Sequence, residues 1–207
     1  MGTRGGVTDL ADLADLRTAA ATCTRCDLYR DATQTVFGVG DAAARMVLIG
    51  EQPGDREDVE GLPFVGPAGR LLDRALEAAG IERRQVYLTN AVKHFKWKRQ
   101  GKVRLHQKPN AEEIRACADW WRAELDAIEP ALVVLLGATA AQAALGSKVR
   151  VTRDRGVVIP AGDAFGHDAL VTIHPSAVLR MRGPEREAAF DDLVHDFQEA
   201  ARYVGDG

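Results

Sequence analysis

A short apolar run that stops at polar residues constrains this chain more than any other feature. Residues 46–49 read Met-Val-Leu-Ile, and the sequence GEQPGD follows at residues 50–55. A run of this length predicts a strand buried on both faces. Ligands bind beyond the carboxyl ends of strands in an open parallel sheet, so Glu51 and Gln52 are candidate ligand contacts. The alternative is an ordinary strand exit with polar turn residues, and this stretch alone does not decide between the two.

Three further apolar runs, separated by segments of helical spacing, predict the fold. The runs lie at residues 86–89, 131–136 and 170–173. Helices are predicted from Thr8 or Asp9 to about residue 21, and over residues 67–80, 110–128, 137–145 and 184–203. This alternation predicts a single α/β domain over residues 1–207, with three layers (α/β/α) and a central, mostly parallel four-stranded sheet. Residues 1–6 are expected to be disordered.

The composition narrows the class of protein. A chain of 207 residues with 46% hydrophobic content suits one compact domain. No apolar run reaches the ~18 residues of a membrane span, and the N-terminus lacks the pattern of a signal peptide. We therefore expect a cytoplasmic protein with no membrane partner, acting as a monomer. The net charge of -3 means that the protein has no overall positive field of the kind that indicates nucleic-acid binding.

The three cysteines are too few for a disulfide framework. Cys23 and Cys26 form a CxxC pair, and Cys117 lies far downstream. The pair is not in the strand-to-helix setting of a thioredoxin-like motif. Metal or iron–sulfur ligation is therefore the sharper interpretation, with a fourth ligand still to be found. The alternative is a set of reduced thiols without a function, which the CxxC spacing disfavours.

One segment concentrates positive charge in a chain that is otherwise acidic. Residues 93–108 contain seven Lys or Arg, two His, two aromatic residues and no acidic residue. Such a segment suits a phosphate backbone whose bases stack on aromatic rings. Within it, Lys93, Lys102 and Arg104 are candidate DNA contacts. The alternative is a solvated basic loop, and the clustering of charge favours the polyanion interpretation.

Residues in other loops and strand ends complete a candidate site. Phe64 lies in a Pro- and Gly-rich loop, where it either stacks on a flat ligand or plugs the loop against the core. Asn90 ends the second predicted strand, and its amide matches a base edge, although Asn is also a common turn residue. His174 follows the fourth strand. In a parallel sheet these residues meet Glu51 at one edge.

Several motifs, in order along the chain, resemble those of the uracil-DNA glycosylase superfamily, in its iron–sulfur-containing family 4. They are GEQPGD at residues 50–55, GLPFVGPAG at 61–69, NAVK at 90–93 and HPS at 174–176. The resemblance runs from about Cys23 to the last helix. Two features depart from family 4: His94 stands where that family has a cysteine, and KVRLH at residues 102–106 resembles the KRRIH insertion of the UdgX subfamily with two substitutions.

The resemblance implies an enzyme that excises uracil from DNA, single-stranded DNA included, in the cytoplasm and on the nucleoid. UdgX proteins then stay covalently bound to the abasic sugar through the histidine of the insertion, here His106. The implied catalytic residues are His106, Glu51, Gln52 and His174. The implied substrate-binding residues are Asp55, Phe64, Asn90 and Arg180, and the implied ligands of a [4Fe–4S] cluster are Cys23, Cys26, His94 and Cys117.

Rival functions stay open on the sequence alone. A hydrolytic uracil-DNA glycosylase that turns over would use water in place of His106. A non-catalytic reader of uracil-containing or single-stranded DNA would bind without releasing the base. An iron–sulfur electron carrier is disfavoured, because it does not need polar residues at strand ends. His167 and His195 are interpreted as solvent or core histidines.

Overall fold

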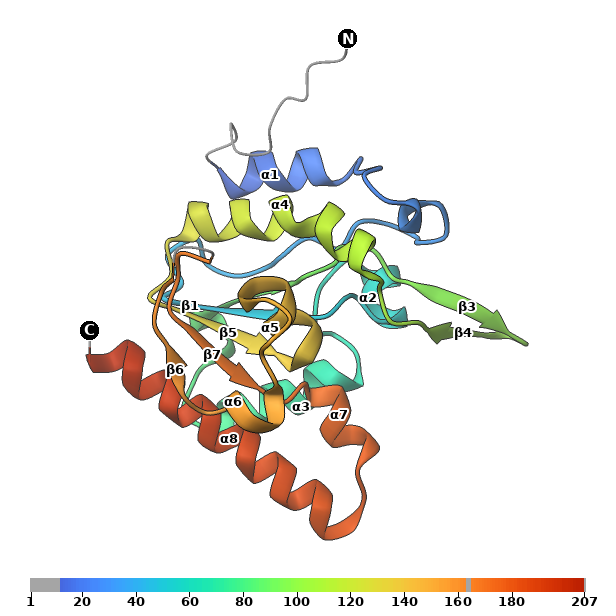
Figure 1. Ribbon diagram of the computed structural model, residues 1–207. Helices are drawn as coiled ribbons and strands as arrows, with labels where there is room; N and C mark the ends of the chain where they lie inside the picture. Colours follow the sequence, from blue (N-terminus) through green and yellow to red (C-terminus); the bar gives the residue numbers. More distant parts are fainter. Residues whose placement is uncertain (1–11, 163–164, 207) are drawn as a thin grey trace.

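The computed structural model describes residues 12–162 and 165–206 (Figure 1). The predicted disorder of residues 1–6 and the predicted helix caps Thr8 and Asp9 lie outside these ranges. Within them, the first helix is α1 (Leu13–Ala20). It begins after Asp12, whose carboxylate accepts a hydrogen bond from the backbone N–H of Ala14.

A five-stranded sheet forms the middle layer. Its order is β2-β1-β5-β7-β6, and β6 pairs antiparallel with β7 while the other strands are parallel. The prediction of a mostly parallel sheet is confirmed, but the predicted number of four strands was one too low. The missed strand, β6, has two half-buried residues, too few for an apolar run or an alternating pattern. The strands are β1 (Met46–Gly50), β2 (Val86–Asn90), β5 (Leu132–Leu136), β6 (Val158–Ile159) and β7 (Ala169–Thr172).

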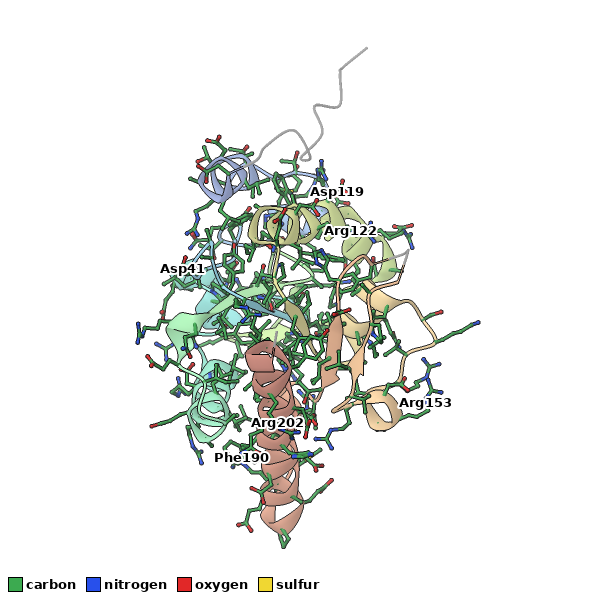
Figure 2. The ribbon with its side chains drawn as sticks, turned by 90° about the vertical axis from the view of Figure 1, so that its left-hand side faces the viewer. Asp41, Asp119, Arg122, Arg153, Phe190 and Arg202 are labelled. Atoms are coloured by element: carbon green, nitrogen blue, oxygen red, sulfur yellow. The ribbon has the colours of Figure 1, made fainter. Side chains whose placement is uncertain are left out.

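Helices cover both faces of the sheet, which confirms the predicted three layers. Leu48 of β1 packs into an apolar cluster with α3 and α8, whereas its neighbour Val47 packs with α4 and α5. Successive strand residues point to opposite faces, so strands with apolar residues at every position bury both sides. Figure 2 shows α8 with Phe190 and Arg202 on the far side of the molecule from α4 with Asp119 and Arg122. The covering helices are α3 (Pro67–Ala78), α4 (Ala111–Ile128), α5 (Gly137–Leu145) and α8 (Gly183–Asp206).

The predicted helix signals act where the sequence has them. Pro67 opens α3, where its missing N–H has no partner to lose. Gly80, with a φ of 78°, follows the end of α3. The Asn110 side chain accepts from the backbone N–H groups of Glu112 and Glu113, and the Glu113 carboxylate accepts from the Asn110 N–H, which is a capping box at the start of α4. The short elements are α2 (Asp55–Glu60), α6 (Val151–Asp154), α7 (Pro175–Arg180) and the 3₁₀ turns at Asp27–Arg30 and Arg83–Gln85.

The basic segment folds as a hairpin that projects from the domain (Figure 1). Its strands are β3 (Trp97–Gln100) and β4 (Val103–His106), which pair antiparallel. Gly101 turns between them with a φ of 61°. The segment at residues 35–40 contributes one isolated bridge, between Val39 and Leu88. Among the described residues, no helix combines the length and apolarity needed to cross a bilayer.

Candidate active site

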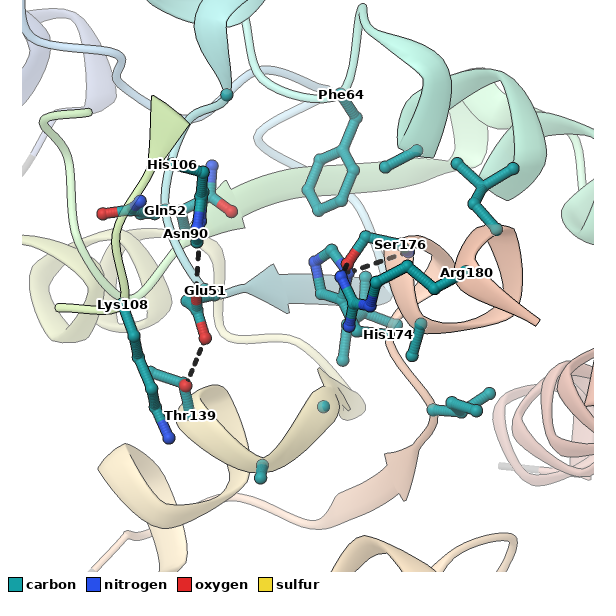
Figure 3. Close-up of a pocket in the computed structure, with 18 of the residues that line it drawn as sticks. Glu51, Gln52, Phe64, Asn90, His106, Lys108, Thr139, His174, Ser176 and Arg180 are labelled. Atoms are coloured by element: carbon teal, nitrogen blue, oxygen red, sulfur yellow. Dashed lines mark hydrogen bonds and ion pairs between the residues drawn. The ribbon is translucent and has the colours of Figure 1, made fainter. Parts of the chain in front are cut away.

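A cavity of about 970 Å³ lies at the carboxyl ends of the parallel strands (Figure 3). Glu51 follows β1, Asn90 ends β2, Gly137 follows β5 and His174 lies just beyond β7, and all four line the cavity. Parallel strands that end at one edge of a sheet bring these residues together, as the sequence predicted. The hairpin supplies a further wall, because His106 at the end of β4 lines the same cavity.

The absence of a side chain at Gly50 makes room for two cavity residues. A Cβ at Gly50 would lie 2.4 Å from the side-chain oxygen of Asn90 and 2.6 Å from Cζ of Phe64. Gly50 and Asn90 are direct partners across β1 and β2. The glycine at the end of the first apolar run therefore lets an amide and an aromatic ring meet at the strand edge.

Phe64 has a backbone conformation that L-residues rarely adopt, with a φ of 56°. A Cβ at Gly69 would lie 1.8 Å from the Phe64 carbonyl oxygen, so only glycine fits behind the loop. The Arg83 guanidinium donates to the same carbonyl at 3.3 Å. The Phe64 ring lies 6.3 Å from the His174 ring, at an interplanar angle of 29°. The Phe64 side chain is buried, as expected of a residue that plugs the loop against the core. It also lines the cavity, as expected of a residue that stacks on a ligand.

Glu51 and His106 form the central pair of the cavity. The Nε2 atom of His106 lies 3.3 Å from Oε1 of Glu51, and the hydroxyl of Thr139 donates to Oε2 at 2.5 Å (Figure 3). Burial by itself would raise the pKa of Glu51. The hydrogen bonds from His106 and Thr139 outweigh it and hold the pKa below its ordinary value. Glu51 is therefore a carboxylate near neutral pH, beside an imidazole that reaches the cavity from another element.

The protonation state of His174 follows from its position as the N-cap of α7. Its Nδ1 atom accepts the backbone N–H of Ser176 at 3.1 Å, so the neutral ring carries its proton on Nε2. Burial lowers the pKa of His174 from 6.5 to about 4, against the opposing charge of Glu51. A Cβ at Gly137 would lie 2.9 Å from Cβ of His174, so this glycine lets the two strand ends approach. His174 is thus a neutral hydrogen-bond donor at pH 7.

Gln52 lines the cavity, but its amide binds the backbone at the base of the hairpin. The amide donates to the carbonyls of Lys96, at 3.3 Å, and Gln107, at 3.0 Å. Its oxygen accepts the backbone N–H of Lys96 at 3.2 Å. These bonds hold together the two ends of the hairpin. Gln52 therefore affects the Glu51–His106 pair by fixing the position of His106.

Arg104, predicted to contact DNA, forms ion pairs within the protein. Its Nε donates to Asp55 at 2.6 Å, and its Nη1 donates to Asp58 at 2.5 Å and to the Thr33 hydroxyl at 3.3 Å. The carboxylate of Asp55, predicted to bind substrate, is therefore already in an ion pair. Asp58, which is fully buried one helical turn after Asp55, was not among the residues predicted from the sequence. The DxxD spacing on the helix α2 was the signal that was available.

Lys93 corrects a second prediction of a DNA contact. Its side chain is 0% exposed, and its Nζ lies 2.5 Å from Oε2 of Glu124. Glu124 also accepts from the hydroxyls of Thr89, at 2.8 Å, and Tyr87, at 3.1 Å. A buried charge needs such partners, and they leave Lys93 no path to DNA. Lys102, by contrast, is exposed at the hairpin turn, where the sequence predicted a contact.

The four predicted cluster ligands lie on one side of the domain. The Cys26 thiol lies near Cys117 and His94, and the interaction with Cys117 is the largest cause that lowers the pKa of Cys26 to about 5. The Cys23 Sγ accepts from the indole N–H of Trp120 at 3.2 Å. Among the residues that the structure describes, Nδ1 of His94 is buried and has no hydrogen-bond partner. A buried nitrogen without a hydrogen-bond partner lowers the stability of a fold, so native structures rarely leave one unpaired.

These donors fit an iron–sulfur group by chemistry rather than by preformed geometry. Thiolates are the usual cluster ligands, histidine replaces cysteine in some clusters, and the free Nδ1 of His94 points to a missing partner. In the described part of the chain, no group of three or more His, Cys, Asp or Glu is arranged to hold a metal ion.

Sequence comparisons with known proteins identify the family to which this chain belongs. Residues 37–198 match the family described as the uracil DNA glycosylase superfamily. The chain is 38% identical over 183 residues to the type-4 uracil-DNA glycosylase of Thermotoga maritima, which covers 88% of this chain and 89% of the relative. It is 32% identical over 174 residues to the type-4 uracil-DNA glycosylase of Pyrobaculum aerophilum, covering 82% and 85%. With its strand-end cavity and these matches, the chain belongs to the uracil-DNA glycosylase superfamily.

Proposed function

We propose that this protein is a uracil-DNA glycosylase that excises uracil and then stays covalently bound to the abasic sugar through His106. The observation that carries the proposal is the contact between Nε2 of His106 and Oε1 of Glu51 at 3.3 Å, inside the strand-end cavity. A hydrolytic enzyme needs a carboxylate that orients water. A carboxylate already in contact with an imidazole favours that imidazole as the nucleophile.

Recognition of uracil rests on Asn90 and Phe64. The target nucleotide leaves the base stack and enters the cavity, because the bond to be cleaved is inaccessible inside the stack. The Asn90 amide pairs with uracil O4 and N3–H, and cytosine presents the reverse pattern of donor and acceptor at these positions. The Phe64 ring offers a stacking surface, and its burial and constrained backbone support a fixed position for it.

His174 stabilises the leaving group. Uracil departs with the electrons of the broken bond, so negative charge develops on its O2. A neutral imidazole with its proton on Nε2 donates a hydrogen bond to that oxygen. The pKa of His174, lowered by burial to about 4, keeps the ring in this neutral form near pH 7.

The covalent step balances with the two central side chains. The bond between C1′ and N1 of uracil breaks, and its electron pair leaves with the base. The proton on Nε2 of His106 passes to Glu51 across their 3.3 Å contact, and the in-plane electron pair that this frees on Nε2 forms the new bond to C1′. Before that transfer the ionised Glu51 stabilises the cationic sugar. The adduct blocks a second turnover.

We also propose that a [4Fe–4S] cluster is held by Cys23, Cys26, Cys117 and His94. Such a cluster supplies a structural link between the CxxC loop, α4 and the start of the basic segment. The free Nδ1 of His94 and the contact of Cys26 with Cys117 support it. Anaerobically purified protein is expected to contain iron and labile sulfide, and His94→Ala to contain less iron. A preparation without iron or sulfide would refute the cluster.

The proposed substrate is uracil-containing DNA, single-stranded DNA included, met in the cytoplasm and on the nucleoid by a monomer. The exposed Lys102 at the hairpin turn suits a contact with the phosphate backbone.

The test is a denaturing gel of the protein mixed with a single-stranded oligonucleotide that contains one uracil. The wild type is expected to give a slow band that resists heat and SDS. His106→Ala is expected to lose that band and to keep part of its excision, seen as strand scission after alkali, because water fits the space of the lost ring. His195→Ala, an exposed histidine on α8, is the matched control and keeps the band.

Each other outcome points to a named alternative. A covalent band with His106→Ala would assign the nucleophile to another residue. Alkali-induced scission without any band from the wild type would mean a hydrolytic glycosylase. Binding without either signal would mean a non-catalytic reader of DNA.

A further inference from the structure

Two positively charged side chains of the cavity are left unused by the excision chemistry. Lys108 and Arg180 both line the cavity and both are exposed. Across the described ranges, neither forms an ion pair with a carboxylate; the one side-chain contact of Arg180 is a 3.4 Å hydrogen bond to the Ser176 hydroxyl. The third basic residue of the lining, Arg56, is already paired with Glu60 at 2.9 Å.

The two cations lie on opposite sides of the cavity (Figure 3). Lys108 extends beside Thr139, on the side of Glu51, whereas Arg180 lies beside Ser176, on the side of His174. The space for the reacting sugar therefore lies between them.

Both positions are fixed by the fold. Lys108 follows Gln107, whose carbonyl is bound by the amide of Gln52 at 3.0 Å. Arg180 is the last residue of α7, which begins at the His174 cap. Each cation is thus attached to the same short segment as a reacting imidazole, because Lys108 lies two residues after His106.

The acidic residues of the lining do not neutralise these cations. Asp55 is paired with Arg104, and Glu57 accepts the backbone N–H groups of Gly54 and Gly66 at 3.1 and 2.7 Å. Glu51 is engaged by its own two partners. In the part of the chain that the structure describes, no acidic side chain pairs with either of these two positive charges on facing walls of the cavity.

We infer that Lys108 and Arg180 clamp the two phosphates that flank the target nucleotide, one phosphate to each side chain. The inference rests on the proposed function, since a nucleotide turned into the cavity carries one phosphate on its 5′ side and one on its 3′ side. Holding both fixes the sugar between the two walls, with C1′ toward the Glu51–His106 pair. The arginine offers a forked contact and the lysine a point charge, so each suits one phosphate.

The experiment uses three oligonucleotides that each contain one uracil. The first has only natural linkages, the second has an uncharged methylphosphonate on the 5′ side of the uridine, and the third has it on the 3′ side. Single-turnover uracil release and equilibrium binding are measured for the wild type, Lys108→Ala, Arg180→Ala and the double variant. Lys148→Ala removes an exposed lysine outside the cavity lining and is the matched control. Thermal midpoints verify that every variant is folded.

The expected result is a reciprocal pattern. On natural DNA, each single variant lowers uracil release by about tenfold, since each loses one phosphate contact. Neutralising one linkage does not slow Lys108→Ala any further, whereas neutralising the other linkage does. Arg180→Ala shows the opposite preference, and Lys148→Ala behaves as the wild type.

The clamp would be overturned if both variants became insensitive to the same linkage, or if each lost equally on all three oligonucleotides. Failure of the proposed function is a different result, because it is absence of uracil release by the wild type from natural DNA. In that event the binding measurements on the same oligonucleotides still decide whether each cation holds a separate phosphate.

Discussion

The central sheet and the projecting hairpin hold the two halves of the cavity by different physical means. Every residue of β1, β2, β5 and β7 is buried, whereas most residues of β3 and β4 are exposed. The sheet is fixed by buried apolar area, worth about 25 cal/mol per Å².

The hairpin is attached by a few polar contacts. They include the ion pairs of Arg104, the amide of Gln52 and the hydrogen bond from the Trp97 indole to the Asp31 carbonyl at 2.9 Å. Asn90 and His174 therefore move only if the core moves. His106 shifts once surface contacts break, so the proposed base recognition and the proposed covalent capture should be separable by mutation.

The largest effect is expected from Gly50→Val, which tests the rigidity of the sheet edge. A Cβ at this position already meets Asn90 at 2.4 Å and Phe64 at 2.6 Å, and neither can retreat into a packed core. We expect uracil release to fall by about a thousandfold or more if the base-reading amide is displaced. Gly162→Val is the control for kinetic assays, because no atom of the described residues lies within 4 Å of a Cβ at Gly162. Excision of uracil near the wild-type rate would show that the sheet edge can shift to accommodate the valine side chain.

Lys93→Met measures the stability held by the buried network of the core. The change leaves the Glu124 carboxylate buried without its cation, and we expect the free energy of unfolding to fall by about 3–5 kcal/mol. The double variant Lys93→Met/Glu124→Gln should recover most of this loss, because it removes both charges and keeps an oxygen that accepts from Thr89 and Tyr87. Urea denaturation measures the free energy of unfolding of the single and the double variant. Arg84→Met, at an exposed surface pair, should leave the urea midpoint unchanged. An equal loss in the single and double variants would contradict the pairing.

Arg104→Ala tests the attachment of the hairpin. Loss of the contacts to Asp55 and Asp58 frees the strand that carries His106, so formation of the covalent band should slow by about tenfold to a hundredfold. Uracil release should change less, because Asn90 and His174 stay in place. Asp58→Asn should slow the band in the same way, and the double variant should add little to either change. A parallel loss of excision and crosslinking would mean that the hairpin and the sheet act as one unit.

The smallest effect is a pH dependence of stability that belongs to the sheet edge. The folded pKa of His174 is about 4, against 6.5 for a free histidine, because burial disfavours the charged ring. As the pH falls from about 6.5 to about 4, the unfolded chain binds a proton that the folded chain does not, so the fold loses stability. The advantage of wild type over His174→Gln in thermal midpoint should shrink by a few degrees across this window. A difference in thermal midpoint between the two proteins that stays constant with pH would refute the lowered pKa of His174.

Sequence reasoning succeeded where the signal is local. The strand at residues 46–49 follows from its run of apolar residues, and Pro67 and Asn110 mark helix starts through their own backbone chemistry. The meeting of Glu51, Asn90 and His174 needs only one more rule, that parallel strands end at the same edge.

Sequence reasoning failed where a partner lies far along the chain. Lys93 and Arg104 look like DNA contacts within a basic segment, but their partners are the distant acids Glu124 and Asp58. Charge clustering does not say which charges are paired, because pairing depends on folded distances. The two-residue strand β6 was missed for a related reason, since only its neighbour β7 makes it a strand.

The sequence by itself determined the layered α/β architecture and the group of side chains at the strand ends, because strand runs, caps and parallel pairing are local or periodic properties. Tertiary structure alone decided which cations are free. It paired Lys93 and Arg104 with buried acids, and it left Lys108 and Arg180 facing the cavity. A long-range contact has no signature in the residues beside it, so only the folded chain shows where positive charge remains for a phosphate.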